Sequence, residues 1–304
     1  MIILGIHDGH DAGACLVENG LITKAVSEER LTRRKHQRGL PNKALAYCLQ
    51  DNVEVDAVAI AGLGRRLKRQ RQLTQAIKDL DLGGKSLLFY EHHLCHQASA
   101  FFTSGWNDST VLSMDSGGDS RCFVFSLAKN SHIHQLGTCS IYDSLGDLYS
   151  AITEHIGFKP MDQEGKTMAL AALGNPHPVS TALDEIINLN PSKLNFSSNF
   201  RFLGSDRRVQ LKTWLTKYTR EDLAAGIQTK LERDTLSLIS QILSITKNSR
   251  LCLAGGIFAN TVLNQKIRQL EGVEELWIFP AMGDAGVCTG EALAAYAGLS
   301  NLND

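Results

Sequence analysis

The stretch IILGIHDGHDAGACLV, residues 2–17, consists of an apolar run, a turn rich in glycine and acidic residues, and a second apolar run. A stretch of the same kind, TVLSMDSGGDSRCFVFSL, occupies residues 110–127. The interval from Asp8 to Cys15 equals that from Asp115 to Cys122. A strand, an acidic turn and a returning strand that occur twice in one chain suggest two duplicated lobes. Two unrelated hairpins are the alternative.

Length and composition narrow the class of protein. At 304 residues the chain is longer than most single domains, which favours two lobes or one large α/β unit. The net charge of −1 gives no reason to expect nucleic acid or an anionic membrane as a partner. No apolar run reaches the ~18 residues of a membrane-spanning helix, and the first residues lack the basic leader of a signal peptide.

The cysteines indicate a compartment. The chain has seven, an odd number, scattered and without a C-x-x-C pair. We therefore expect buried, reduced thiols and a cytoplasmic protein.

Hydrophobic periodicity predicts further elements. Asn19-Gly20 between two apolar runs predicts a tight β-hairpin. Buried strands are expected at 55–61, 251–254 and 275–279, amphipathic helices over 143–157 and about 220–247, and an exposed helix near 68–80. Residues 175–220 carry the weakest pattern.

The stretch HHLCHQASAFF, residues 92–102, follows the strand-like segment SLLFY. On a helix, His92 and His96 project from one face, one turn apart, as two imidazoles must in order to share a metal ion. His93 lies about 100° away around the helix and is expected to be structural, as is His7. The same spacing also occurs in histidines that simply satisfy their hydrogen bonds on a surface or in a core.

Two carboxylates could complete a metal site with the two imidazoles. Asp115 and Asp284 each follow a predicted strand, and strand ends of an open α/β sheet converge on one crevice. If the two lobes close over one cleft, both aspartates meet His92 and His96. Two imidazoles and two carboxylates suit Fe(II), Zn²⁺ or Mn²⁺.

Glycine turns could cradle a phosphate. The pairs Gly117-Gly118 and Gly255-Gly256 each follow a predicted strand, and glycine lets backbone N–H groups approach phosphate oxygens. Plain turn chemistry is the alternative for each pair. Neither a Walker nor a Rossmann glycine motif occurs in the required context.

Several polar side chains could assist such a site. Lys166 could pair with a phosphate as a point charge, or be a solvated lysine at the start of a helix. Asn260 and Asn264 could contact a nucleoside, or cap a helix. Glu164 could bind an amine or hydroxyl group. An unperturbed imidazole titrates near neutrality, so His10 could polarise a carbonyl or accept a proton, or it could be a turn histidine.

Seven segments, in order along the chain, resemble the motifs of the NodU/CmcH-type O-carbamoyltransferases. They are HDGHDAGACLV, EERLTRRKHQRGLP, HHLCHQASAFF, MDSGGDS, EGKTMALAALG, AGGIFANTVLNQKI and PAMGDAG. The resemblance implies a duplicated, two-lobed actin/sugar-kinase-like α/β fold with mixed sheets, with lobes at about 1–105 and 106–304.

The resemblance also implies a function. Such enzymes move a carbamoyl group from carbamoyl adenylate to a hydroxyl group of a small molecule. The family's metal ligands fall on His92, His96, Asp115 and Asp284, with Fe(II) the favoured ion. ATP or carbamoyl adenylate is the expected nucleotide. The family's first-motif histidine, near the carbamoyl group, falls on His10, and the acidic residue two positions earlier falls on Asp8.

The sequence departs from the family in two respects. The family pattern is H-D-A-S-A, and this chain has Gly13 where the pattern has serine, so one hydroxyl group is absent. Family members also continue into a second domain that makes carbamoyl adenylate from carbamoyl phosphate and ATP. We therefore expect a separate protein to supply the adenylate, or a truncated sequence, or a changed activity.

Two other functions stay open. The chain could be a nucleotide-binding subunit without chemistry of its own. It could also transfer threonylcarbamoyl to tRNA, although the HDGHDA opening and the lack of a concentrated basic face argue against it. The acceptor itself cannot be named, because acceptor contacts lie in variable loops.

Overall fold

The computed structural model describes residues 1–50, 53–62, 71, 73–75, 77–82, 84–199 and 211–300. Its first five-stranded mixed sheet has the order β3-β2-β1-β4-β5. The hairpin strands β1, β2 and β3 are antiparallel, whereas β4 and β5 run parallel to β1. The strands are β1 (Ile2–His7), β2 (Gly13–Glu18), β3 (Leu21–Ser27), β4 (Ala57–Ala61) and β5 (Ser86–Tyr90).

The second sheet repeats this plan. Its order is β8-β7-β6-β11-β12, again with three antiparallel strands and two parallel ones. The strands are β6 (Asp108–Gly118), β7 (Arg121–Lys129), β8 (His132–Ser140), β11 (Arg250–Ala254) and β12 (Glu275–Ile278). The duplication predicted from the paired strand-turn-strand stretches is therefore confirmed.

The turns between β2 and β3 and between β6 and β7 are each two residues long, and the second is shorter than its acidic, glycine-rich stretch suggested. Asn19 and Gly20 both have positive φ, the geometry of a two-residue hairpin turn, as predicted. In the second hairpin, β6 runs on through Gly118, and the turn is Asp119-Ser120, also with positive φ at both residues. The register shifts between Met114 and Gly118, so the backbone around Asp115 leaves the regular ladder. Such a bulge re-aims side chains.

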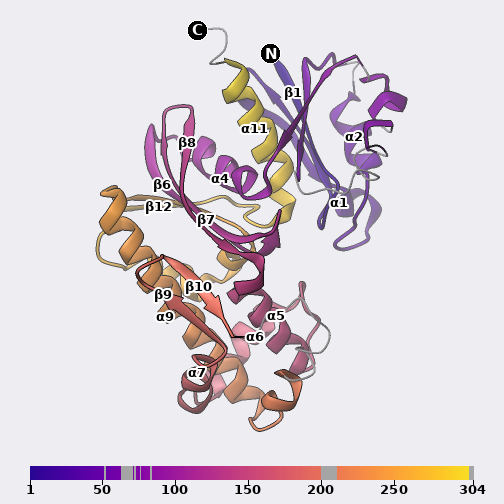
Figure 1. Ribbon diagram of the computed structural model, residues 1–304. Helices are drawn as coiled ribbons and strands as arrows, with labels where there is room; N and C mark the ends of the chain where they lie inside the picture. The colour runs from indigo at the N-terminus through magenta and orange to yellow at the C-terminus, as the bar shows by residue number, and fades with distance from the viewer. Residues whose placement is uncertain are drawn as a thin grey trace.

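Two helices tie the lobes together (Figure 1). Helix α4 (His92–Thr103) follows the first sheet but packs on the second, where Phe101 contacts a cluster that includes Val111 and Cys252. Helix α11 (Val287–Ser300) follows the second sheet but packs on the first, where Ala292 joins Ile3. The two helices also pack against each other. The division of the chain near residue 105 stays a prediction, since each sheet shares a helix across it.

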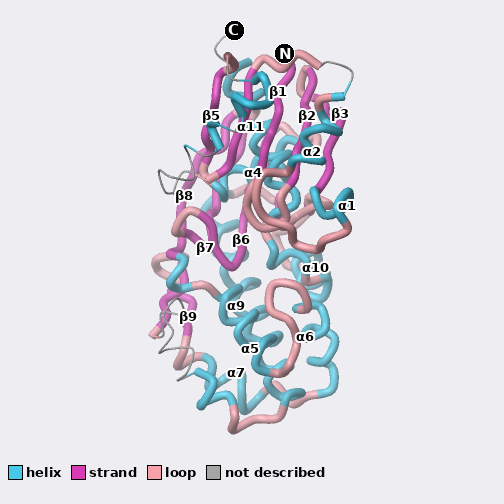
Figure 2. Tube along the Cα trace, turned by 90° about the vertical axis from the view of Figure 1, so that its right-hand side faces the viewer, coloured by secondary structure: helices cyan, strands magenta, loops and turns pink. Residues whose placement is uncertain are grey.

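The remaining elements flank the first sheet or belong to the second lobe, where β9 and β10 form a small sheet of their own. On the first sheet these are α1 (Glu28–Thr32), α2 (Asn42–Cys48) and η2 (Lys78–Leu82). On the second lobe they are η3 (Ile141–Asp143), α5 (Leu145–His155), α6 (Glu164–Leu170), η4 (Ala171–Leu173), α7 (His177–Leu183), β9 (Ile187–Asn190), β10 (Asn195–Ser198), α9 (Arg220–Thr246), η5 (Gly256–Ala259), α10 (Thr261–Arg268) and η6 (Asp284–Gly286). Figure 2 shows α5, α6, α7 and α9 gathered at the end of the molecule away from both termini.

The structure agrees with most of the predicted elements. The helices expected over 143–157 and 220–247 are α5 and α9, and the strands expected at 251–254 and 275–279 are β11 and β12. The helix expected near 68–80 is described only in part: residues 71, 73–75 and 77 are helical and η2 follows, with Leu73 and Ile77 buried rather than exposed. All seven cysteines are buried and free, as expected. Over the described residues, none of the helices combines the length and the apolar character that crossing a membrane requires.

Candidate active site

The first turn of α4 is held in place by two carboxylates. Glu91 is the N-cap residue, and its side chain accepts a hydrogen bond from Leu94 N at 2.8 Å. Asp119, in the turn of the second hairpin, accepts from His92 N at 2.9 Å. These bonds satisfy N–H groups that have no partner within the helix. They fix the positions of His92 and, one turn later, His96, and both rings are buried.

The structure brings His92, His96, Asp115 and Asp284 together, as the sequence predicts. Nε2 of His96 lies 3.2 Å from Asp115 Oδ2 and 3.4 Å from Asp284 Oδ1. Nε2 of His92 lies 3.5 Å from Asp284 Oδ1 and 3.8 Å from Asp115 Oδ2. One potential ligand atom from each of the four lies within 4.8 Å of all the others. Asp115 comes from the irregular part of β6, and Asp284 begins η6.

The donor atoms fit a divalent transition metal ion. The Nε2 atoms of His92 and His96 face each other at 3.0 Å, so at most one of them can donate in that contact. Asp284 Oδ1 is buried without a hydrogen bond in the described residues. Burial opposes the charged form of His96, but the nearby carboxylates of Asp115 and Asp284 raise the pKa of that ring to about 9. Two nitrogens and two carboxylate oxygens are the donors that Fe(II), Zn²⁺ and Mn²⁺ accept.

Two further histidines lie near these four. His93 is held between Ser113 Oγ at 3.0 Å and the carbonyl oxygen of Arg121 at 3.1 Å. Burial and the neighbouring imidazoles lower the pKa of His93 to about 3, so the ring is neutral and structural, as expected. His7 lies with Nε2 3.0 Å from the carbonyl oxygen of His10 and 4.0 Å from Asp284 Oδ2. It therefore borders the cluster, which the sequence did not indicate.

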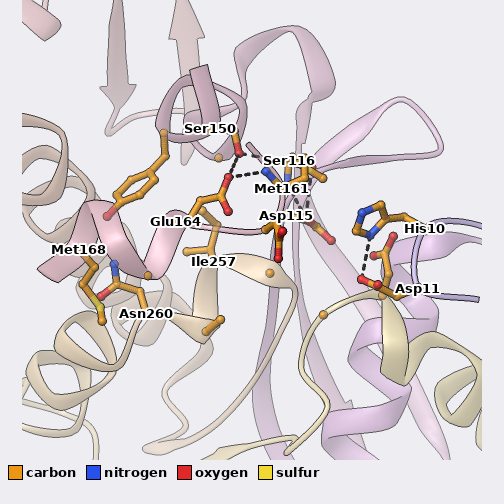
Figure 3. Close-up of a pocket in the computed structure, with 18 of the residues that line it drawn as sticks. His10, Asp11, Asp115, Ser116, Ser150, Met161, Glu164, Met168, Ile257 and Asn260 are labelled. Atoms are coloured by element: carbon orange, nitrogen blue, oxygen red, sulfur yellow. Dashed lines mark hydrogen bonds and ion pairs between the residues drawn. The ribbon is translucent and has the colours of Figure 1, made fainter. Parts of the chain in front are cut away.

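A cavity of about 310 Å³ opens beside Asp115 and Asp284. Figure 3 shows Asp115 between two groups of lining residues. On one side lie His10 and Asp11 from the loop after β1. On the other lie Glu164 from α6 and Asn260 from the start of α10. Loops of the first lobe and helices of the second thus enclose one space.

The predicted glycine cradle lines the cavity only in part. Gly256 lines it, and a Cβ added there would lie 3.2 Å from Asp115 Oδ1. Gly255 supports the turn from behind, because its φ is +103° and a Cβ would lie 2.1 Å from the carbonyl oxygen of Met114. Gly117 and Gly118 are not among the lining residues. Gly118 instead makes room for the His92 ring, whose nearest atom would be 2.1 Å from an added Cβ.

Of the other predicted residues, Asn260 and His10 line the cavity, whereas Lys166 and Asp8 do not. Asn260 caps α10, accepting from Leu263 N at 3.0 Å, and also lines the cavity, so its contact with a nucleoside stays a prediction. Lys166 is exposed and lies over the Phe158 ring at 5.6 Å, outside the cavity lining. The structure does not place it on the cavity wall, to which Glu164, Gly165 and Met168 of the same helix contribute. Asp8 is buried but does not line the cavity, whereas His10 does.

Glu164 lines the cavity but is engaged within the second lobe. Its Oε1 accepts from Ser150 Oγ and from Met161 N, both at 2.6 Å. These two bonds fix the loop before α6 against α5. Asn264 donates to the carbonyl oxygen of Phe258 at 2.7 Å and is a local structural residue.

Sequence reasoning missed three cavity residues that form one cluster with His10. Asp11, His36 and Asp162 all line the cavity. His36 stands within the basic run 33–38, where a charge run is the obvious interpretation. Asp162 lies 126 positions further along the chain, and no spacing signal links the two.

The chain is similar to a family model and to several curated proteins. The family model described as carbamoyltransferase N-terminus matches residues 2–79 and 66–293. An uncharacterized protein of Methanocaldococcus jannaschii is 32% identical over 303 residues, covering 96% of this chain and 57% of that protein. Nodulation protein NolNO of Sinorhizobium fredii is 29% identical, covering 93% of this chain and 46% of that protein. The chain thus spans about half the length of these curated relatives.

Solved structures show the same fold at low identity. Component A of (R)-2-hydroxyglutaryl-CoA dehydratase from Acidaminococcus fermentans has a TM-score of 0.54 and 15% identity, covering 99% of each chain. HypF of T. kodakarensis has a TM-score of 0.60 and 12% identity, covering 99% of this chain and 48% of that one. The expected two-lobed actin/sugar-kinase-like α/β fold is confirmed. Since the family model covers nearly all of the described residues, the chain belongs to the carbamoyltransferase N-terminal family.

Proposed function

We propose that the protein transfers a carbamoyl group from carbamoyl adenylate to a hydroxyl group of a small molecule. The observation that supports this most is the meeting of two histidines and two aspartates beside a cavity, in a chain of the carbamoyltransferase family. A separate protein or domain that forms carbamoyl adenylate would supply the donor.

The charge of the cavity supports a bound cation. Among the described residues that line it there are five carboxylates and no lysine or arginine; the five are Asp11, Asp115, Asp162, Glu164 and Asp284. A nucleotide phosphate would be repelled by this wall. His92, His96, Asp115 and Asp284 would hold a divalent ion there, with Fe(II) favoured by the family resemblance. When bound, the ion supplies the positive charge that anchors the phosphate.

The cavity wall beside Asp115 suits a nucleotide. Gly256 presents backbone without a side chain next to Asp115, and Ser116 and Gly146 line the same part of the cavity. Asn260 lies further along the wall and exchanges hydrogen bonds with Gln228 at 2.8 and 3.2 Å. We propose that ATP or the adenylate lies along these residues, with its phosphate toward Asp115.

His10 is the proposed base. In the transfer, the acceptor oxygen bonds to the carbamoyl carbon, the bond from that carbon to the phosphate oxygen breaks, and AMP leaves. His10 Nδ1 lies 2.8 Å from Asp11 Oδ2. A ring that donates from Nδ1 keeps a lone pair on Nε2, which can accept the hydroxyl proton.

Metal removal tests this proposal. The protein is treated with a chelator and reloaded with Fe(II), Zn²⁺ or Mn²⁺, then incubated with carbamoyl adenylate and a panel of alcohols and sugars. We expect carbamoylated product and AMP by mass spectrometry, loss of transfer of about 100-fold or more without metal, and recovery on reloading. Transfer that is insensitive to the chelator would remove the metal from the mechanism.

The same assay separates the other two functions. Tight ATP binding without transfer to any acceptor would favour a nucleotide-binding subunit. Transfer of a threonylcarbamoyl group to tRNA, and to no small molecule, would favour the tRNA reaction. Either result would overturn the proposed function.

A substitution at Gly256 tests the nucleotide position. Gly256→Val places a branched side chain on the cavity wall beside Asp115, where even a Cβ is 3.2 Å from a carboxylate oxygen. We expect the affinity for ATP to fall about tenfold or more by calorimetry. Gly84→Val is the control, since a Cβ at Gly84 meets nothing within 4 Å. Equal ATP affinity in both variants would place the nucleotide elsewhere.

A further inference from the structure

A chain of short polar contacts crosses one wall of the cavity and joins the two lobes. Asp11 Oδ2 lies 2.8 Å from Nδ1 of His10, and Asp11 Oδ1 lies 2.7 Å from Nδ1 of His36. On the far side of the same ring, His36 Nε2 lies 3.0 Å from Asp162 Oδ1. The rings of His10 and His36 stack, with centroids 4.8 Å apart. One carboxylate therefore serves two imidazoles, and one imidazole serves two carboxylates.

Both nitrogens of His36 face a carboxylate oxygen, so both are suited to donate. Only a doubly protonated, cationic imidazole can donate from both nitrogens. Partial burial opposes that charge, but the hydrogen bonds to Asp162 and Asp11 outweigh it, and the pKa of His36 lies above its usual value. The titratable and charged groups around His36 are Asp11, Asp162, His10, Glu29, Lys35 and Lys159.

The loops are built to hold this arrangement. Asp11 and His36 both have left-handed backbone, with φ of 55° and 54°. Such residues cost about 1 kcal/mol or more each and tend to gather at functional sites. Glu29 accepts from His36 N at 2.9 Å, and Ala12 N donates to the carbonyl oxygen of Gln37 at 2.9 Å. The backbone on both sides of the cluster is thus tied down independently of the side-chain contacts.

We propose that His36 is a positioning residue for the transfer reaction: as a cation between Asp11 and Asp162, it holds the Asp11 carboxylate in the position that orients the His10 ring at the cavity. This inference rests on the proposed function. It adds a residue from the basic run and a contact between lobes that the family resemblance did not assign.

The reason is the position of one carboxylate. Asp11 Oδ2 can orient the His10 ring through Nδ1 only while the carboxylate itself is held in place. The cation of His36 holds the other oxygen of Asp11, so the carboxylate keeps that position. Asp162 in turn compensates His36 and ties the loop before α6 to the first lobe. The hydrogen bond from His36 and the contact with Lys159 lower the pKa of Asp162 to about 2.

The protonation state of His36 can be observed without any assay of transfer. Long-range ¹⁵N–¹H spectra of [¹⁵N]histidine-labelled protein distinguish a cationic ring from either neutral tautomer. At neutral pH we expect His36 with both nitrogens protonated, each facing a carboxylate oxygen. Loss of these signals in His36→Gln assigns them. A neutral His36 at neutral pH would overturn the proposal.

The spectra also separate this bridge from a second metal site. His10, Asp11 and His36 are close enough to hold an ion, and an ion on either Nδ1 would replace its proton. Spectra recorded with and without Zn²⁺ should show the His36 protons retained in both. Loss of the Nδ1 proton of His36 with Zn²⁺ would overturn the bridge and assign a metal site in its place.

Kinetics test the role in transfer. For His36→Gln we expect kcat/KM to fall about tenfold to a hundredfold, mainly through kcat because the His10 ring is no longer held in its orientation. Asp162→Asn should act in the same direction, and Asp162→Glu should restore part of the loss. His132→Gln, an exposed histidine on β8, is the control.

Failure of this inference differs from failure of the proposed function. If His36→Gln keeps the wild-type kcat, the positioning role is wrong although transfer stands. If the wild-type protein transfers nothing under any condition, the proposed function is wrong, and the spectra still decide whether His36 is a cationic bridge.

Discussion

Replacing His96 with alanine is expected to weaken metal binding by about 100-fold or more and to reduce transfer at least as much. His96 is fully buried, and its Nε2 lies within 3.4 Å of both Asp115 and Asp284. Without this ring, only two carboxylates and one imidazole remain as ligands, so a bound metal ion would lose one of its four contacts. Metal content after dialysis, measured by plasma mass spectrometry, and the rate of AMP release check the two effects.

The matched control is His93, another buried histidine of helix α4. His93 is also fully buried, but its two nitrogens are bonded to Ser113 and to the backbone of Arg121. His93→Gln is therefore expected to lower the free energy of unfolding by about 1–3 kcal/mol while the metal content stays near that of the wild type. Loss of metal from His93→Gln with retention by His96→Ala would contradict the assignment of the two residues.

Gly290→Ala is expected to destabilise the protein by about 3 kcal/mol or more, although alanine normally favours a helix. Gly290 is where α11 crosses α4, and an added Cβ would lie 1.7 Å from the carbonyl oxygen of Cys95. That oxygen belongs to helical backbone, which cannot move aside without shifting α4 and the histidines that it carries. Urea unfolding followed by circular dichroism measures the loss.

A second glycine on α11 serves as the control. A Cβ at Gly298 meets only Tyr90 Oη, at the ordinary contact distance of 3.9 Å. Gly298→Ala should therefore stabilise the protein by about 0.5–1 kcal/mol through helix propensity. If Gly290→Ala is as stable as Gly298→Ala, the two helices are not packed as closely as described.

The repeated hairpins and the histidine spacing could be predicted because they are local signals. Asn19-Gly20 has the conformations that a two-residue turn requires. His92 and His96 needed only the helical period to be placed on one face. The choice of Asp115 and Asp284 as their partners rested on their positions after predicted strands and on the resemblance to a family, since nothing local joins residues so far apart in the chain.

Other parts depend on tertiary contacts that no pattern carries. Gly118 was predicted to cradle a phosphate, but it makes room for the His92 ring. Lys166 was predicted near the same phosphate, but the turn of α6 directs it to Phe158. The side on which a helix meets its neighbour decides both outcomes, and the sequence of a seven-residue helix does not specify that side.

The cluster around His36 could not be predicted from the sequence, because it also depends on tertiary contacts. Its neighbours Arg33, Arg34 and Lys35 mark the segment as a charged surface, and its partner Asp162 belongs to the other lobe. Only the folded chain shows that the ring is held between two carboxylates.

Anomalous diffraction from crystals loaded with Fe(II) or Mn²⁺ tests most directly whether one cation joins the two lobes. The expected result is a single strong peak at about 2.0–2.3 Å from Nε2 of His92 and of His96, in contact with Asp115 and Asp284. A peak at another place, or no peak beside these four side chains in crystals that contain the metal, would contradict it.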